Sequence, residues 1–215
     1  MKRITFLTGY YGSGKTEIAL NLAVKEKADY LVDLDIINPY FRSREAEEFL
    51  KGLGTKIISS DLKDSAYSDM PFLSKQIFLP FLQDGCRAIY DLGGNDLGAK
   101  VMRQFEKIDK QIVDLFLVVN VYREETRDTT SILKLIDKIQ GSSGFAITGI
   151  INNSNLLRET TYDDIMSGEA KIAEASKISG IPLVYTCFYE ELFQPSFAYM
   201  GEPLILKLYF RKKWY

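Results

Sequence analysis

Short apolar segments alternate with amphipathic segments along the whole chain. Several apolar runs are continuous rather than alternating, for example Ile112-Val113-Asp114-Leu115-Phe116-Leu117-Val118-Val119. Continuous apolar strands are typical of a parallel sheet that is buried between two layers of helices. The pattern predicts strands at 3–8, 29–34, 55–59, 87–92, 113–120, 145–152 and 182–188. It predicts helices at 15–26, 43–52, 71–83, 98–108, 126–140 and 162–179.

This alternation predicts an α/β fold, a three-layer α/β/α sandwich whose mostly parallel sheet has about seven strands. The chain has 215 residues, of which 46% are hydrophobic, and this is enough for one domain, 1–215, with a sizeable core. A last helix is expected to start at Pro203, a residue favoured in the first helical turn. The basic, aromatic end at 211–215 allows either a membrane-surface anchor or a docked helix whose basic residues suit its dipole.

A glycine-rich segment at 9–16 matches the pattern G-x-x-x-x-G-K-[ST] of phosphate-binding loops. A β-prone run precedes it, and a strong helix former follows it. In such a unit the backbone N–H groups point at phosphate oxygens, and the helix N-terminus adds about half a positive charge. We expect Lys15 to reach the β- and γ-phosphates and the Thr16 hydroxyl to bind Mg²⁺. The expected phosphate-binding residues are Gly9, Tyr10, Tyr11, Gly12, Ser13, Gly14, Lys15 and Thr16.

Two carboxylates, Asp33 and Asp35, end the second predicted strand and are separated by one residue. One could accept the water shell of Mg²⁺, and the other could orient an attacking water. Arg42 and Arg44 follow on a loop, where a guanidinium can contact γ-phosphate oxygens in a bidentate manner. The alternative is a strand end that is capped by solvated Asp and Arg side chains.

The run Ala88-Ile89-Tyr90-Asp91-Leu92-Gly93-Gly94 is an apolar strand that ends in a carboxylate. This is the Walker B pattern, in which the carboxylate holds Mg²⁺, here Asp91 together with Thr16 and Asp35. The same segment contains D-x-x-G, from Asp91 to Gly94. The Gly94 N–H is therefore expected to touch the γ-phosphate and to move after hydrolysis.

A further buried-looking strand ends in Asn152 and Asn153. An Asn amide has both a donor and an acceptor, which suits a purine edge, although an Asn-rich turn is the alternative. Guanine-specific sites usually add an Asp three residues after the Asn, and this place holds Asn155 or Leu156. Adenine is therefore favoured over guanine.

The amino-acid composition limits which side chains can take part in catalysis or metal binding. The chain contains no histidine, which excludes a histidine-rich metal-delivery GTPase and leaves carboxylates, Lys, Arg, backbone N–H groups and Mg²⁺. The net charge of −2 gives no sign of general nucleic-acid binding. No apolar run approaches a membrane span or a signal peptide, and Cys86 and Cys187 form no C-x-x-C. We therefore expect a cytoplasmic protein.

With these segments in hand, the chain resembles the MinD/ParA/CobQ group of P-loop proteins, within the SIMIBI class of nucleoside triphosphatases. That group includes division-site and plasmid-partition ATPases and the nitrogenase iron protein. The resemblance covers roughly residues 1–190 and rests on GYYGSGKT, LVDLDIINPYFRSRE, IYDLGG and GIINNSN. It implies that Asp33 and Asp35 are switch I carboxylates, that Asp91 is the Walker B carboxylate and that Asn153 contacts the base.

One position departs from this group. Members that form ATP-sandwiched dimers carry a second lysine just after the first loop glycine, and here that position is Tyr10. Because tyrosine donates no full positive charge, the usual dimer-activated mechanism is in doubt. Our hypothesis is that Arg42 or Arg44 supplies the missing charge, from the same chain or from a partner.

The sequence thus predicts an ATP- and Mg²⁺-dependent ATPase that acts as a molecular switch between ATP and ADP states. A phosphoryl-transfer enzyme acting on a small molecule is the alternative, as in the dethiobiotin-synthetase and cobyrinate-amidase relatives of this fold. Segments 59–69 and 189–202 would then build the second pocket. A non-catalytic nucleotide-binding module is the third possibility. A homodimer, an unidentified protein partner and membrane contact through the C-terminal helix stay open.

Overall fold

A computed structural model describes residues 1–35, 44–59, 75–94, 96–195 and 197–209. These residues build one sheet in the order β3-β2-β4-β1-β5-β6-β7-β8, and all neighbouring strands are parallel. The strands are β1 Ile4–Gly9, β2 Tyr30–Leu34, β3 Lys56–Ser59, β4 Ala88–Leu92, β5 Val113–Val119, β6 Gly149–Asn152, β7 Leu183–Tyr189 and β8 Glu202–Leu206.

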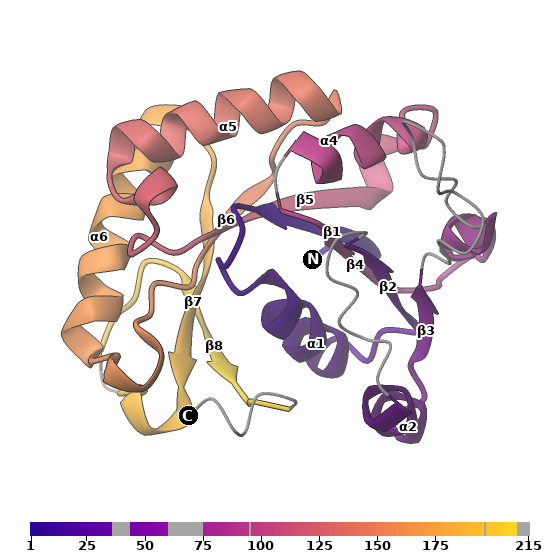
Figure 1. Cartoon of the computed structure of the whole chain (residues 1–215), viewed down its shortest axis with the longest axis horizontal. Coiled ribbons are helices and arrows are strands. Elements are labelled where there is room, and N and C mark those ends of the chain that lie inside the picture. The colour runs from indigo at the N-terminus through magenta and orange to yellow at the C-terminus, as the bar shows by residue number, and fades with distance from the viewer. Residues whose placement is uncertain (36–43, 60–74, 95, 196, 210–215) are drawn as a thin grey trace.

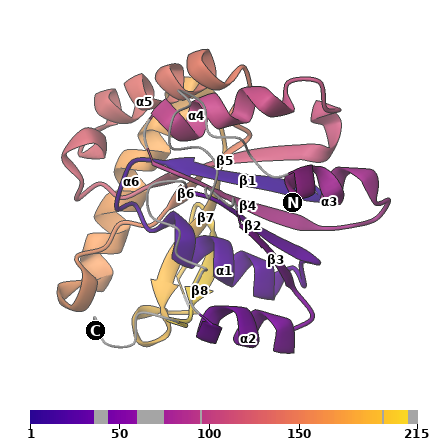
Figure 2. The same ribbon diagram turned by 45° about the vertical axis from the view of Figure 1, so that its right-hand side comes forward.

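Helices cover both faces of this sheet. The α4, α5 and α6 helices lie over one face, and α1 and α2 lie over the other (Figures 1 and 2). The predicted three-layer sandwich with a parallel sheet is therefore confirmed, with one strand more than expected. The helices are α1 Lys15–Lys25, α2 Arg44–Gly52, α3 Leu79–Leu82, α4 Asp96–Met102, α5 Thr129–Ser143 and α6 Tyr162–Ser179.

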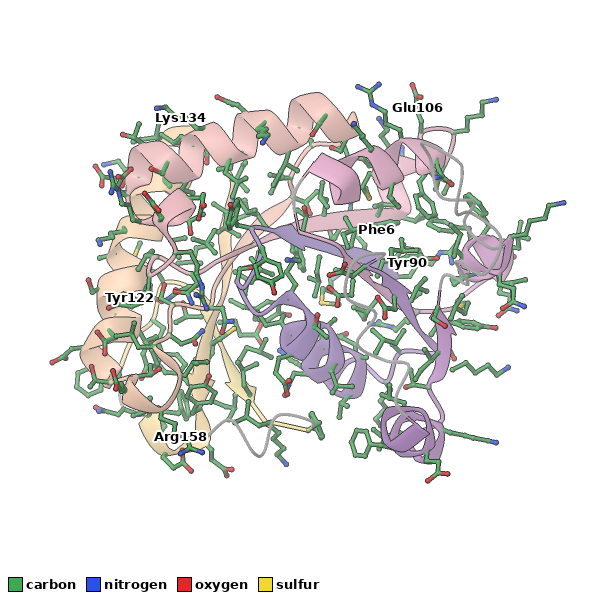
Figure 3. All side chains as sticks on the ribbon, viewed as in Figure 1. Phe6, Tyr90, Glu106, Tyr122, Lys134 and Arg158 are labelled. Carbon is green, nitrogen blue, oxygen red and sulfur yellow. The ribbon has the colours of Figure 1, made fainter. Side chains whose placement is uncertain are left out.

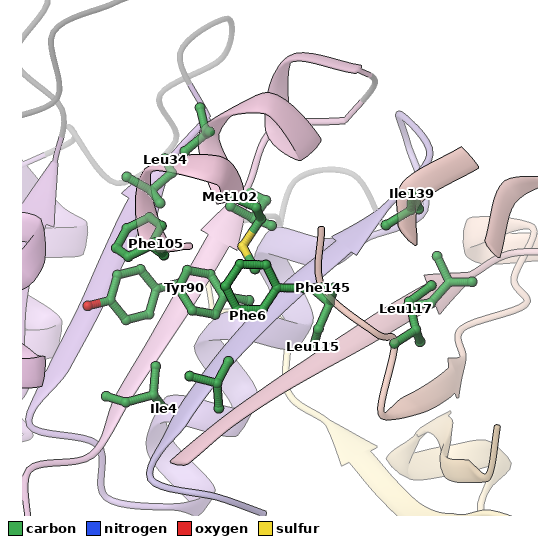
Figure 4. Close-up of a cluster of buried hydrophobic side chains, with 14 of the residues drawn as sticks. Ile4, Phe6, Leu34, Tyr90, Met102, Phe105, Leu115, Leu117, Ile139 and Phe145 are labelled. Carbon is green, nitrogen blue, oxygen red and sulfur yellow. The ribbon is translucent and has the colours of Figure 1, made fainter. Parts of the chain in front are cut away.

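Each face of the sheet has its own apolar core. Under α4 and α5, Phe6 stacks on Tyr90 with ring centroids 4.4 Å apart, and Phe105 meets Phe6 edge-on at 5.1 Å (Figures 3 and 4). On the opposite face the buried side of α1 packs against Leu31 of β2 and Leu204 of β8. Because both faces of the central strands are buried, these strands read as continuous apolar runs.

Several predicted boundaries differ from those of the structure. The 126–140 helix is α5, which starts after Asp128 and ends at Gly144. The Asp128 carboxylate accepts a hydrogen bond from the Ser131 N–H at 2.8 Å, and Gly144 adopts a φ of 73°, which favours glycine. Helix ends are set by such caps, which apolar periodicity does not encode.

Two other predicted helices are shorter than expected. The part of 71–83 that the structure describes is a 3₁₀ turn followed by the short helix α3, and 98–108 becomes α4 followed by another 3₁₀ turn. The prediction for 162–179, in contrast, coincides with α6. That helix is bounded by a reciprocal capping box and by a glycine with φ of 73°.

The expected helix at Pro203 is wrong, because this segment is strand β8, which pairs in parallel with β7. Leu204 and Leu206 are buried, while Ile205 between them is only half-buried, so burial follows the period of a strand. Pro203 is tolerated because β8 lies at the edge of the sheet. Beyond β8, the Lys207 N–H donates to Oδ1 of Asn21 in α1 at 2.8 Å.

The correction removes the helix on which membrane contact depended. Residues 210–215, which include the basic, aromatic end of the chain, lie outside the described residues. Within the described ranges, no helix has both the length and the apolarity that crossing a membrane requires. Cys86 and Cys187 are buried free thiols.

A pair of substitutions tests the strand. Leu204→Ala should lower the free energy of unfolding by about 2–4 kcal/mol, because it opens a cavity beneath β8. Ile205→Ala should cost about 1 kcal/mol, because this side chain is partly solvated. Urea denaturation of both variants makes the comparison. Equal losses would indicate the helical face that the sequence suggested.

Candidate functional site

The predicted motifs meet at the carboxyl edge of the sheet around β1. This strand lies between β4 and β5, with β2 beyond β4 and β6 beyond β5. The loops that follow all five strands therefore open on the same edge, where open α/β sheets bind ligands. Four sequence segments that are far apart along the chain come together in this way.

The loop after β1 has the backbone of a phosphate cradle. Gly9, Gly12 and Gly14 have φ values of 147°, 73° and 89°, which L side chains rarely adopt. A Cβ on Gly9 would collide with the carbonyl oxygen of Val118 in β5, and a Cβ on Gly14 would collide with Nδ2 of Asn153. Glycine is thus required both for the curl of the loop and for its close contacts with β5 and with the Asn153 side chain after β6.

Lys15, in the first turn of α1, is folded back over this loop. Its side chain is 6% exposed, and Nζ donates a hydrogen bond to the Tyr10 carbonyl at 3.0 Å. Burial lowers the pKa of Lys15, while the carboxylates of Asp91 and Asp35 oppose this change. The ammonium is therefore held inside the loop, close to two carboxylates and to few waters.

The sheet register sets Asp33 and Asp91 side by side, since they are direct partners in β2 and β4. Both are 1% exposed. Oδ1 of Asp33 accepts the Asp35 N–H at 3.0 Å. Burial raises the pKa of Asp91 to about 7; Lys15 and the Thr16 hydroxyl oppose the rise, and Asp33 adds to it.

Asp91 is the main indication of a ligand. Neither of its carboxylate oxygens accepts a hydrogen bond of regular geometry from the part of the chain that the structure describes. The buried Ser13 hydroxyl in the phosphate loop likewise has no partner there. Buried polar groups are nearly always satisfied, so these atoms point to a cation and an anion as partners. A carboxylate beside a threonine hydroxyl is an oxygen donor set that fits Mg²⁺.

Of the two glycines after β4, Gly94 lies against the phosphate loop and Gly93 lies against Asp35. A Cβ on Gly94 would lie 2.9 Å from the Tyr11 nitrogen and 3.4 Å from Nζ of Lys15. A Cβ on Gly93 would lie 3.3 Å from Oδ1 of Asp35. The D-x-x-G segment therefore reaches the end of the Lys15 side chain, and the contact of Gly94 with a γ-phosphate stays a prediction.

The two asparagines after β6 have different surroundings. Asn152 is fully buried, and its amide bonds the Ile165 carbonyl and the Ser154 N–H, so this side chain supports the fold. Asn153 donates from Nδ2 to the Ser13 carbonyl at 2.8 Å and thus holds the phosphate loop. A base contact by the Asn pair therefore stays a prediction that rests on Asn153.

For the predicted arginines and part of the predicted second pocket, the structure gives no side-chain positions. Arg42 lies outside the described residues, Arg44 opens α2 without a described side chain, and 60–74 is also outside. In the 189–202 segment, Phe193 and Tyr199 pack on Phe188 of β7. The buried Glu169 carboxylate accepts the Gly201 N–H at 3.3 Å and holds this segment against α6.

The sequence analysis missed the loop after β5, residues 120–126. Nε of Arg123 donates to the Gly12 carbonyl at 3.1 Å. The neighbouring Glu125 carboxylate raises the pKa of Tyr10. The sequence offered one indication of this loop. It follows the long apolar strand β5, and loops after parallel strands lie at the carboxyl edge of the sheet, where the phosphate loop also lies.

A cavity of about 300 Å³ adjoins the start of the phosphate loop. One face of α5, from Ser131 to Ser142, forms one wall, and the end of β1 forms the other. Its lining residues include Thr8, Gly9, Tyr10, Glu125, Ser131 and Leu135.

No family model matches this sequence, and no curated protein matches it either. Among solved structures, the chain is similar to cell division protein FtsY from Thermotoga maritima, with a TM-score of 0.51 and 15% identity. That match covers 86% of this chain and 60% of the other. Chloroplast FtsY from Physcomitrella patens gives a TM-score of 0.52 and 14% identity over 85% and 57%.

These likenesses show that the chain has the fold of the P-loop nucleoside triphosphatases. The chain spans less than two thirds of the length of these structures. A structure of FlhF complexed with GTP and Mg²⁺ also matches, with a TM-score of 0.45, 15% identity and coverage of 75% of this chain and 58% of that one. At that distance the match does not assign a nucleotide to this chain.

The pKa of Asp91 predicts a pH dependence of stability. Because the pKa is raised from 3.8 to about 7 on folding, the folded protein binds this proton more tightly than the unfolded chain does. The free energy of unfolding should therefore fall as pH rises from about 4 to 7. Asp91→Asn should remove this decline, so that the variant gains on the order of 2–4 kcal/mol relative to wild type across that range.

Urea denaturation at several pH values measures the difference, with Asp84→Asn at an exposed carboxylate as the control. Parallel curves for wild type and Asp91→Asn would contradict the assignment of this titration to Asp91.

Proposed function

We propose that the protein is a Mg²⁺-dependent purine nucleoside triphosphatase that prefers ATP and acts as a molecular switch. The observation that carries the proposal is the buried Asp91 carboxylate, without a regular hydrogen bond from the described residues, beside the Lys15 ammonium and the phosphate loop. The described contacts give this buried carboxylate no structural role. A nucleotide triphosphate with its metal would satisfy both charges.

Each residue of the site has a role that follows from its place. The loop amides and the N-terminus of α1 bind phosphate oxygens, and Lys15 exchanges its bond to the Tyr10 carbonyl for the β- and γ-phosphates. Thr16 and Asp91 would hold Mg²⁺, which when bound neutralises charge that develops on the phosphates. Phosphoryl transfer then needs positioning more than covalent chemistry from the protein.

Of the two carboxylates at the end of β2, Asp35 is better suited to orient the attacking water. Asp33 is buried, and its Oδ1 is occupied by the Asp35 N–H. Asp35 is half-buried and lies over Gly93, next to Gly94, whose N–H would contact the γ-phosphate. The Gly94 backbone and the loop after Asp35 would change position when the γ-phosphate leaves, as in nucleotide switches.

Membership of the MinD/ParA/CobQ group is part of this proposal, and it is supported by Asp33, Asp35 and Asp91 at the sheet edge. We assign adenine rather than guanine because the sequence lacks an Asp three residues after Asn152 or Asn153. A one-domain, cytoplasmic protein is the setting that we propose for this activity. An ATP-dependent homodimer and a protein partner are outcomes to be measured, not parts of the proposal.

The first test is calorimetric titration of ADP, ATP and GTP in the presence of Mg²⁺. Lys15→Ala should weaken ATP binding by about a hundredfold, since it removes a charge-assisted contact with the phosphates. Wild type should bind ATP more tightly than GTP. Phosphate release should fall with binding. Lys177→Ala, on the exposed side of α6, is the matched control and should behave as wild type.

Intact ATP and ADP affinity in Lys15→Ala would overturn the proposal. Tight ATP binding without phosphate release, in contrast, would indicate the non-catalytic module.

One observation favours a second candidate, a phosphoryl-transfer enzyme. The cavity of about 300 Å³ shares Gly9 and Tyr10 with the phosphate loop, and a small second substrate would fit there. It lies against α5 and not in the segments that the sequence suggested.

Ser131→Phe separates the two functions, because a phenylalanine at this lining position would fill the cavity. A switch should retain the phosphate release of wild type within about twofold, whereas a transferase should lose release that depends on an added metabolite. Phosphate release with and without a metabolite extract makes the measurement. The thermal midpoint of the variant checks that it is folded.

A further inference from the structure

The loop at residues 120–126 is a rigid element placed against the phosphate loop. The Asn120 side chain organises it: Oδ1 accepts the Tyr122 N–H at 3.0 Å, and Nδ2 donates to the Asn155 carbonyl at 3.1 Å. The buried Thr126 hydroxyl donates to the Asn120 carbonyl at 2.6 Å. These bonds close the loop on itself and fix it to the segment after β6.

Two neighbouring side chains leave this loop for different partners. The Tyr122 hydroxyl donates to Oδ1 of Asp164 in α6 at 2.7 Å, and Figure 3 shows Tyr122 beside that helix. Nε of Arg123 donates to the Gly12 carbonyl, and a Cβ on Gly12 would lie 3.3 Å from Cζ of Arg123. The guanidinium is therefore packed on the middle of the phosphate loop.

The guanidinium of Arg123 is not neutralised by an ion pair with a described carboxylate. Within the described part of the chain, no Asp or Glu forms an ion pair with Arg123, whereas Arg127 on the same connection pairs with Asp128 at 3.4 Å. Arg123 is also exposed, so an incoming ligand can reach it. Its contact with the protein uses Nε, and the two terminal nitrogens of the planar fork remain for bidentate contacts.

Tyr10, in contrast, is unavailable for this purpose. The carboxylates of Glu125 and Glu124 raise the pKa of its hydroxyl, and this side chain carries no positive charge. Position 10 therefore supplies no cation to the site.

We propose that Arg123 is a phosphate-binding residue that supplies the second cation of the nucleotide site from the same chain. The inference rests on the proposed function, because it requires a polyphosphate in the loop. It replaces our hypothesis for Arg42 and Arg44 with a residue whose contact with the phosphate loop is described. The geometry that carries it is the guanidinium on Gly12, held there by a loop that Asn120 makes rigid.

The test must separate the charge of Arg123 from its hydrogen bond to the loop. Arg123→Gln keeps a donor for the Gly12 carbonyl and removes the charge, and Arg123→Lys keeps the charge. We expect Arg123→Gln to weaken Mg·ATP binding about tenfold or more, and Arg123→Lys to recover most of the loss. Arg123→Gln should also make ATP affinity less dependent on NaCl concentration. Arg127→Gln is the matched control and should bind as wild type.

Calorimetry of these variants, with thermal midpoints as a check on folding, gives distinguishable outcomes. Wild-type affinity and salt dependence in Arg123→Gln would overturn the inference. So would equal losses in Arg123→Gln and Arg123→Lys at lowered midpoints, because Arg123 would then only anchor the loop. A loss confined to Arg42→Ala or Arg44→Ala would return the role to those residues. Unchanged affinity in Lys15→Ala would instead refute the proposed function.

Discussion

The site depends on one constraint: the fold buries the side chains of Lys15 and Asp91 near each other at the same edge of the sheet. The sheet register fixes Asp91 between Leu7 of β1 and Asp33 of β2, and the turn after β1 brings Lys15 back to the same edge. Burial acts in opposite directions on the two groups, lowering the pKa of Lys15 and raising that of Asp91. Both charged forms are therefore disfavoured by their surroundings, and a ligand that brings a cation and an anion would stabilise both.

Local patterns predicted the parts of this site that are contiguous in sequence. A short local pattern was enough to predict the strand, glycine loop and helix around Gly9. The same holds for the apolar strands that end in Asp33 and Asp91. Their meeting was also predictable, because parallel strands end at one edge of the sheet. The three-layer architecture was predictable from the continuous apolar runs, because such strands must be buried on both faces of the sheet.

Contacts between distant segments were not predictable from these patterns. The bond from Arg123 to Gly12 joins residues that are 111 positions apart, and no local periodicity signals it. The edge strand β8 was misassigned because Leu204 and Ile205 are adjacent apolar residues, and such a pair fits a helical face as well as a strand. Only the pairing with β7, which buries Leu204 and Leu206, decides between the two.

The neighbours of position 10 explain why a tyrosine rather than a lysine suits this place. A lysine there would face Glu124 and Glu125, the two carboxylates that now act on the Tyr10 hydroxyl, and it would pair with them before any phosphate arrived. A neutral tyrosine hydroxyl tolerates these acidic neighbours, which raise its pKa, and the carbonyl of the same residue holds Lys15. The loop after β5 thus combines opposite tasks in three consecutive residues. Its two carboxylates act on the side chain of Tyr10. Its arginine brings positive charge to Gly12, and no carboxylate of the described chain forms an ion pair with that arginine.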